Sequence, residues 1–152
     1  MMTSNDSKHY MIESELVPMP FARLTIANPD VSPAVRADLA SGITALLEKD
    51  LLKEPEVTVV HVNLVPADTW FAPVTKPGQA TGVHLEVSIT AGTDTSTEKA
   101  AFIEHAYTLL SDRLGPLPAA AYVALYELDG ESYGYNGVTQ LARRRLDPSE
   151  KD

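Results

Sequence analysis

The chain has 152 residues, 44% of them hydrophobic, which is enough for one ordinary hydrophobic core. It contains no cysteine, so disulfides, thiolate metal sites and cysteine nucleophiles are excluded. Its net charge of -9 opposes binding to nucleic acid or anionic lipid, which both need clustered lysine and arginine. No apolar run approaches the roughly 20 residues of a membrane-spanning helix, and no signal-peptide pattern opens the chain. We therefore expect one cytoplasmic domain without nucleic-acid or membrane partners.

The two ends of the chain lack the pattern of a packed element. The first 18 residues mix polar residues and methionines without a period of 2 or 3.6, so we assign residues 1–19 to an extension outside the core. Residues 141–152 are expected to form a short basic turn of helix and a charged tail. The core is then expected to span residues 20–140.

The first half of this core predicts a strand, a helix and a second strand. Ala22, Leu24 and Ile26 alternate with polar or aromatic residues, as in a strand with one buried face. Ser32 followed by Pro33 is typical of a helix start, and apolar residues then recur at helical spacing. A β-rich run over residues 57–65 closes the unit.

The second half predicts the same order of elements. Residues 85–89 alternate in the same phase as the first strand. Thr95 with Glu98 forms a capping-box pattern before an amphipathic stretch that ends at Gly115. A β-rich run over residues 121–128 follows. The sequence therefore predicts tandem β-α-β units.

A shift of 63 residues places residues 20–73 on residues 83–136 without a gap. The expected helix caps Ser32 and Thr95 coincide under this shift. Within each unit, one crossover helix should leave the two strands parallel. We therefore predict an α+β domain, a four-stranded sheet with both helices on one face.

The other face of this sheet is expected to be both polar and aromatic. If the alternating apolar residues point to the helices, the opposite side chains include Phe21, Arg23, His61, Asn63, His84, Glu86, Tyr122 and Tyr126. Such a face is too mixed for free solvent and too polar for a dry core. It predicts burial against other subunits in a homo-oligomer.

Both ends of this core resemble the tautomerase superfamily. Met19-Pro20-Phe21 opening a strand is similar to the start of its first unit, and SYGYNGVTQ at residues 132–140 is similar to the S-(W/Y)-G-x-x-G-x-x-Q ending of its members. The resemblance covers about residues 19–144. The superfamily includes 4-oxalocrotonate tautomerase (4-OT), 5-carboxymethyl-2-hydroxymuconate isomerase, haloacrylate dehalogenases and malonate semialdehyde decarboxylase. Its longer members are fusions of two units, which implies a trimer here.

The resemblance implies general acid–base catalysis by Pro20. A secondary amine in an apolar pocket has a lowered pKa and can move a proton between oxygen and carbon, interconverting the enol and keto forms of a small 2-oxo acid. No metal or cofactor is required, and Val83 replaces the proline in the second unit. As written, Pro20 follows Met19, and an amide nitrogen is not a base. We hypothesise that translation begins at Met19, which is then removed, or that residues 1–19 are cleaved.

Five residues are candidates for substrate binding. They are Arg23, His61, Asn63, Trp70 and Tyr126. Arg23 would hold a carboxylate, and Tyr126 would donate a hydrogen bond to an enolate oxygen. His61 and Asn63 would instead serve as interface hydrogen-bonding groups if they lack this role, and Trp70 would cover the sheet edge. His84 with Glu86 lacks a third ligand, so no metal site is predicted.

Other readings of the same sequence remain open. Arginines are missing where the dicarboxylate-binding members carry them, which argues against dehalogenase and decarboxylase activity. A non-catalytic, small-molecule-binding member of the superfamily would fit an internal Pro20. The order β-α-β-β-α-β is also that of ferredoxin-like dimeric barrels, whose strands run antiparallel across the whole sheet.

Overall fold

The computed structural model describes residues 19–72 and 80–146. Its main elements are β1 (Phe21–Ile26), α2 (Pro33–Leu51), β2 (Val59–Leu64), β3 (Val83–Thr90), α3 (Ser96–Leu114) and β4 (Tyr122–Leu128). The 3-10 turns η1 (Pro55–Val57) and η2 (Ala67–Thr69) flank β2, and the chain closes with β5 (Gly134–Tyr135), β6 (Val138–Thr139) and α4 (Gln140–Leu146). The assigned extension, except Met19, and residues 147–152 of the tail lie outside the described residues.

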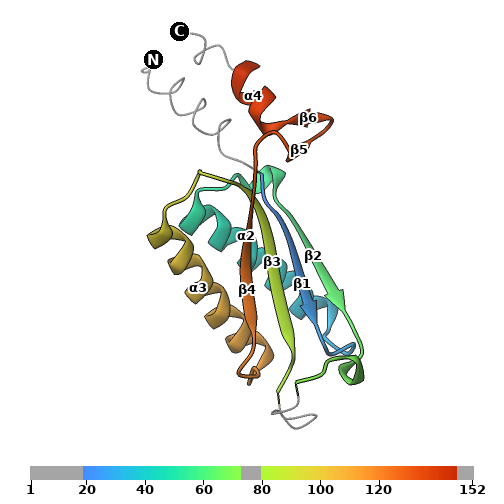
Figure 1. Cartoon of the computed structure of the whole chain (residues 1–152). Coiled ribbons are helices and arrows are strands. Elements are labelled where there is room, and N and C mark those ends of the chain that lie inside the picture. The colour runs from blue at the N-terminus through green and yellow to red at the C-terminus, as the bar shows by residue number, and fades with distance from the viewer. Residues whose placement is uncertain (1–18, 73–79, 147–152) are drawn as a thin grey trace, which may run out of the picture.

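Four strands form one mixed sheet in the order β2-β1-β3-β4. β1 is parallel to β2, and β3 is parallel to β4, whereas β1 and β3 are antiparallel. Both long helices cover the same face (Figure 1). The α+β fold with two helices on one face is therefore confirmed. The parallel pairs differ from the antiparallel sheet expected of a ferredoxin-like barrel.

The internal repeat extends to the ends of the helices. A shift of 63 residues carries α2 (Pro33–Leu51) onto α3 (Ser96–Leu114). The predicted caps explain both starts: the Ser32 hydroxyl accepts from the Val35 amide, and Thr95 with Glu98 forms a complete capping box. The second strand of the first unit covers residues 59–64 and not the predicted 57–65, because at its start Val57 belongs to the turn η1.

The hydrophobic core lies between the sheet and the two helices. Its members alternate along β1 and β3 and recur along the facing sides of α2 and α3, as in Leu24, Val87, Ile43 and Phe102. The opposite sheet face is open in the single chain, with Tyr122 64% and Tyr126 43% exposed. The predicted split between an apolar and a mixed face is thus confirmed. Among the described residues, no helix is long and apolar enough to cross a membrane.

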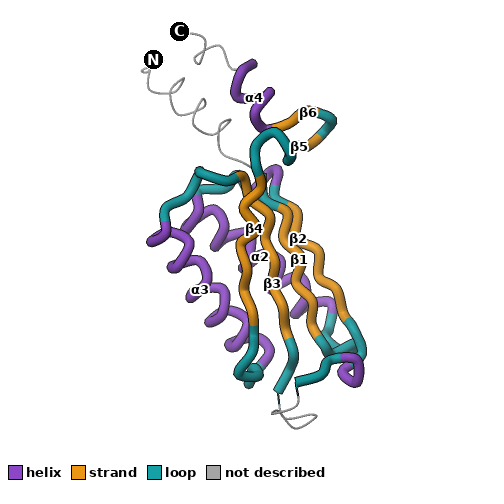
Figure 2. The backbone as a smooth tube through the Cα atoms, in the orientation of Figure 1, coloured by secondary structure: helices purple, strands orange, loops and turns teal. Residues whose placement is uncertain are grey.

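The antiparallel pairing of β1 with β3 gives the sheet two distinct ends. At one end, which we call the Pro20 end, Phe21 pairs with Ser88. At the other end, Ile26 pairs with Val83, and Ala27 donates a backbone hydrogen bond to Gly82. The tube in Figure 2 shows the hairpin β5-β6 and α4 beyond the Pro20 end.

The far end of the sheet is closed by Trp70, which packs directly against the backbone of Gly82. A Cβ atom on residue 82 would lie 2.3 Å from the indole, so Gly82→Ala should displace Trp70 and cost about 1–3 kcal/mol by overpacking. Trp70 is the one tryptophan of the chain, so its fluorescence spectrum reports the displacement directly.

Gly130→Ala is the matched control, because a Cβ there would meet its nearest neighbour at an ordinary 3.5 Å. We expect Gly82→Ala to shift both the emission maximum and the melting temperature, and Gly130→Ala to shift neither appreciably. Unchanged fluorescence and melting in Gly82→Ala would contradict the packing of Trp70 described here.

Candidate functional site

Pro20 is buried at the point where the chain enters β1. Its carbonyl accepts a hydrogen bond from the Val59 amide at 3.4 Å, which links it to β2. Its nitrogen belongs to the peptide bond with Met19, a residue that is only 8% exposed. The backbone on both sides of the Pro20 nitrogen is therefore held within the folded chain.

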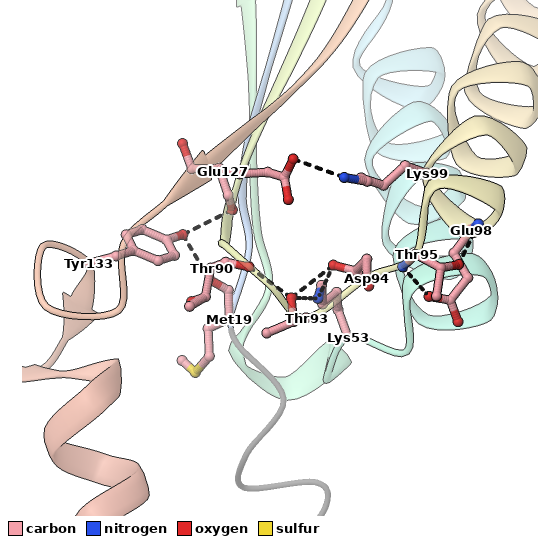
Figure 3. Close-up of polar contacts among 11 residues, drawn as sticks. Met19, Lys53, Thr90, Thr93, Asp94, Thr95, Glu98, Lys99, Glu127 and Tyr133 are labelled. Carbon is pink, nitrogen blue, oxygen red and sulfur yellow. Dashed lines mark hydrogen bonds and ion pairs between the residues drawn. The ribbon is translucent and has the colours of Figure 1, made fainter.

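The hydroxyl of Tyr133 holds the chain just before Pro20. It lies 2.7 Å from the Met19 carbonyl oxygen and 3.1 Å from the Ser88 carbonyl oxygen (Figure 3). A phenol carries one proton, and the shorter contact identifies Met19 as its principal acceptor. Burial raises the pKa of Tyr133, although a hydrogen bond with the Phe21 backbone opposes this, so the hydroxyl keeps its proton at neutral pH.

A buried ion pair lies beside this end of the sheet. The Lys53 ammonium is 2.9 Å from the Asp94 carboxylate, and the two side chains are only 1% and 2% exposed. Thr93 bridges the pair to β3, since its hydroxyl donates to the Thr90 carbonyl at 2.8 Å (Figure 3). Burial lowers the pKa of Lys53, and Asp94 opposes that shift. The pair joins the loop after α2, in the first unit, to the loop before α3, in the second unit.

A polar pocket of about 150 Å³ opens next to this cluster. Its lining residues come from the ends of β3 and β4 and from α4: Thr90, Ala91, Thr93, Asp129, Gly130, Gln140, Leu141 and Arg144. The Thr90 hydroxyl and the Gln140 amide nitrogen are buried without a hydrogen-bond partner. Because polar groups of this kind are normally satisfied, the pocket suits water or a small polar molecule.

Arg23 and His61 form a second polar group on the open face. Arg23 Nε donates to His61 Nδ1 at 3.2 Å, which requires the proton of a neutral imidazole to be on Nε2. The guanidinium also lies over the Phe21 ring, 5.1 Å from its centroid. Adjacent strands carry all three residues, so β1 and β2 bring two predicted binding residues together near Pro20.

The other predicted binding residues lie farther away. Tyr126 pairs with Ser88 and so lies at the Pro20 end, but it is on β4, two strands from β1. Asn63 pairs with Thr25, towards the far end of β1. Trp70 is at the far end itself, about 17 Å from the start of β1 at the usual rise per strand residue. One chain therefore does not gather the five predicted residues in one place, and their roles remain predictions.

Two residues of the Pro20 end were not predicted from the sequence. Lys53 and Asp94 are far apart in the sequence, and their pairing depends on the contact between the two units. Tyr133 belongs to the SYGYNGVTQ ending of the sequence, which predicts a residue of the pocket wall or the sheet edge but not its contact with Met19. His84 and Glu86, considered as metal ligands, lie 3.8 Å apart, and the described residues contain no group of three side chains suited to a metal ion.

Comparison with known proteins identifies the fold. No protein-family model and no curated protein matches the sequence. Among solved structures, a wild-type fused 4-OT described as an asymmetric trimer, F6, is 17% identical, with a TM-score of 0.70 over 80% of this chain and 97% of that chain. A macrophage migration inhibitory factor-like protein from Entamoeba histolytica is 16% identical, with a TM-score of 0.62 over 79% of this chain and 97% of that chain.

A third solved structure is of Pt0534 inactivated by 2-oxo-3-pentynoate. It is 14% identical to this chain and has a TM-score of 0.68, covering 82% of this chain and 97% of that chain. At these identities the likeness concerns the fold.

The buried ion pair allows a direct stability test. Asp94→Asn leaves the Lys53 ammonium buried without its counter-charge, which should lower the free energy of unfolding by about 3–5 kcal/mol. Asp38→Asn is the control, because the Asp38–Arg113 pair is exposed and should contribute at most about 1 kcal/mol.

The loss in Asp94→Asn should also depend on pH. Without Asp94 the pKa of buried Lys53 falls further below its ordinary 10.5, so the unfolded chain binds more protons than the folded chain between the two values. Stability therefore rises with pH in that window, and urea unfolding should show a smaller deficit in alkaline buffer than at lower pH. A deficit as small as that of Asp38→Asn would show that the pair is not buried.

Proposed function

From this tautomerase-superfamily fold, with Pro20 at the start of its first strand, we propose that the protein is a cofactor-independent isomerase. It would interconvert the enol and keto forms of a small 2-oxo acid, with the amine of Pro20 as the general base once no residue precedes it. The observation that carries the proposal is the position of Pro20, buried where β1 begins in a chain that matches fused 4-OT structures over 80% of its length.

The proposed chemistry requires only a proton transfer. The free amine takes the proton from the enol hydroxyl, and the resulting ammonium delivers it to the neighbouring carbon, so nothing is oxidised or reduced. Burial favours the neutral amine over the ammonium and so prepares the base at neutral pH. With the Met19 peptide bond in place, the same nitrogen cannot accept a proton.

The predicted binding residues have unequal support. Arg23 and His61 lie near Pro20 on neighbouring strands, and the Arg23 guanidinium suits a substrate carboxylate. Tyr126 belongs to the same end of the sheet. Asn63 and Trp70 lie towards the far end, so they would reach a Pro20 site only from another subunit of an oligomer.

A second candidate function is non-catalytic binding of a small polar molecule. It is favoured by the pocket that holds the unpartnered Thr90 and Gln140 groups while the Pro20 nitrogen remains an amide. This function would not depend on the N-terminus.

The catalytic proposal predicts a large difference between two forms of the chain. A chain that begins at Pro20, made by removal of Met19, should ketonise phenylenolpyruvate about 10²–10⁴-fold faster than the 152-residue chain, because only the former has a basic nitrogen. 2-Oxo-3-pentynoate, named in the structure of inactivated Pt0534, should modify the shorter chain at Pro20, which peptide mass mapping would locate.

The shorter chain retains every residue of the hydrophobic core, and its circular dichroism and melting temperature provide the folding control. Equal rates for the two forms would exclude Pro20 as the base. A folded but inactive Pro20 chain would instead favour the non-catalytic function.

The open sheet face predicts a homotrimer. The fused 4-OT structures are described as trimers, and here the exposed Tyr122 and Tyr126 lie on the face that the helices leave uncovered. Sedimentation velocity at micromolar concentration should give three chains of 16.5 kDa each. Tyr122→Asp should dissociate the assembly, because it places a charge in the interface, whereas Tyr107→Asp on α3 should not. A wild-type monomer would contradict the proposal.

A further inference from the structure

The contact between Tyr133 and Met19 identifies a further group beside the Pro20 nitrogen. The Tyr133 hydroxyl is 2.7 Å from the Met19 carbonyl oxygen. In a peptide bond the carbonyl oxygen lies about 2.2 Å from the nitrogen, and here that nitrogen belongs to Pro20. The hydroxyl is therefore within about 5 Å of the Pro20 nitrogen, on the geometry of the peptide unit alone.

Removal of Met19 would change what this hydroxyl faces. Its principal acceptor disappears with the residue, and the Ser88 carbonyl at 3.1 Å is then the weaker acceptor that a substrate oxygen would replace. The backbone of Tyr133 is fixed, because its carbonyl accepts from the Gln140 amide at 2.8 Å. The result is a positioned donor within about 5 Å of a free secondary amine.

We propose that Tyr133 is a catalytic hydrogen-bond donor to the substrate's carbonyl oxygen, and that in the longer chain the Met19 carbonyl takes this hydrogen bond instead. The inference rests on the proposed function. A reacting carbon about 3 Å from the amine, and the oxygen of the adjoining carbonyl about 2.7 Å from the phenol, fit a separation of about 5 Å between the two groups. The site would thus accept a 2-oxo acid whose reacting carbon adjoins the carbonyl.

The step balances without a further reagent. In the keto-to-enol direction, the Pro20 amine takes a proton from the carbon, the C–H electron pair becomes the C=C bond, and the carbonyl π pair moves to oxygen. Tyr133 donates its hydrogen bond to this oxygen, which strengthens as negative charge develops. The proton on the Pro20 nitrogen then passes through water to the oxygen, which yields the enol and restores the amine.

The environment of Tyr133 suits this role. Burial raises the pKa of its phenol, so the donor keeps its proton at a pH where a buried amine is already neutral. Tyr126, the donor expected from the sequence, lies on β4 and is 43% exposed. Tyr133 is thus the tyrosine that the structure places against the Pro20 peptide.

The test compares kinetics in the chain that begins at Pro20. Tyr133→Phe should lower kcat about 10²–10³-fold, as for loss of one donor to a developing oxyanion, with little change in KM. Tyr135→Phe is the matched control from the same hairpin and should retain the parent rate. Modification of Pro20 by 2-oxo-3-pentynoate should persist in Tyr133→Phe, which would show that the base and pocket are intact.

A second variant covers the case in which Tyr133→Phe folds poorly. A fluorinated tyrosine at position 133 keeps the shape of the ring but lowers the pKa of the phenol, so the alkaline loss of kcat should move to lower pH. A purely structural role would leave that limb unchanged. If the chain that begins at Pro20 is active, this inference alone is overturned by a kcat of Tyr133→Phe within about twofold of the parent, or by an alkaline loss of kcat that does not move with fluorotyrosine. If that parent chain is inactive, the proposed function is overturned and this inference with it.

Discussion

The antiparallel pairing of β1 with β3 is the constraint on which the rest of the arrangement depends. It joins two β-α-β units into one sheet and sets the start of the first unit beside the end of the second unit's first strand. Residues that are remote in sequence therefore gather at the Pro20 end: Tyr133 after β4, which bonds to Met19, and the Lys53–Asp94 pair, which joins the two units. The apolar faces of both units then close on one core, and the Pro20 end remains the place where polar groups of both halves converge.

A proline nitrogen at this position has two chemical states. Within the peptide bond it is an amide, and the carbonyl of that bond accepts the hydrogen bond of the Tyr133 hydroxyl. As an N-terminus it is a secondary amine, and loss of the same carbonyl leaves the hydroxyl available. One covalent change would thus provide both a base and a donor. In the longer chain the nitrogen is not basic and the hydroxyl is bonded to the Met19 carbonyl, so neither group is available to a substrate.

Local patterns predicted most of the fold, because caps and alternating apolar residues act over a few positions. Ser32, Thr95 and Gly115 mark helix ends in both sequence and structure, and the 63-residue shift relates the second helix to the first. The site was less predictable, since the contacts of Lys53 and Tyr133 span 41 and 114 residues. The distance of Trp70 from Pro20 could have been predicted from the sequence. Trp70 follows β2, which runs parallel to β1, so it must lie at the end of the sheet opposite Pro20.

The account is tested most directly by the N-terminal sequence and intact mass of the protein isolated from the cells that make it. If the protein acts through the amine of Pro20, the mature chain begins at Pro20 and lacks the mass of residues 1–19. Mature protein that retains Met19 or any earlier residue would keep the nitrogen of Pro20 as an amide and would contradict the account.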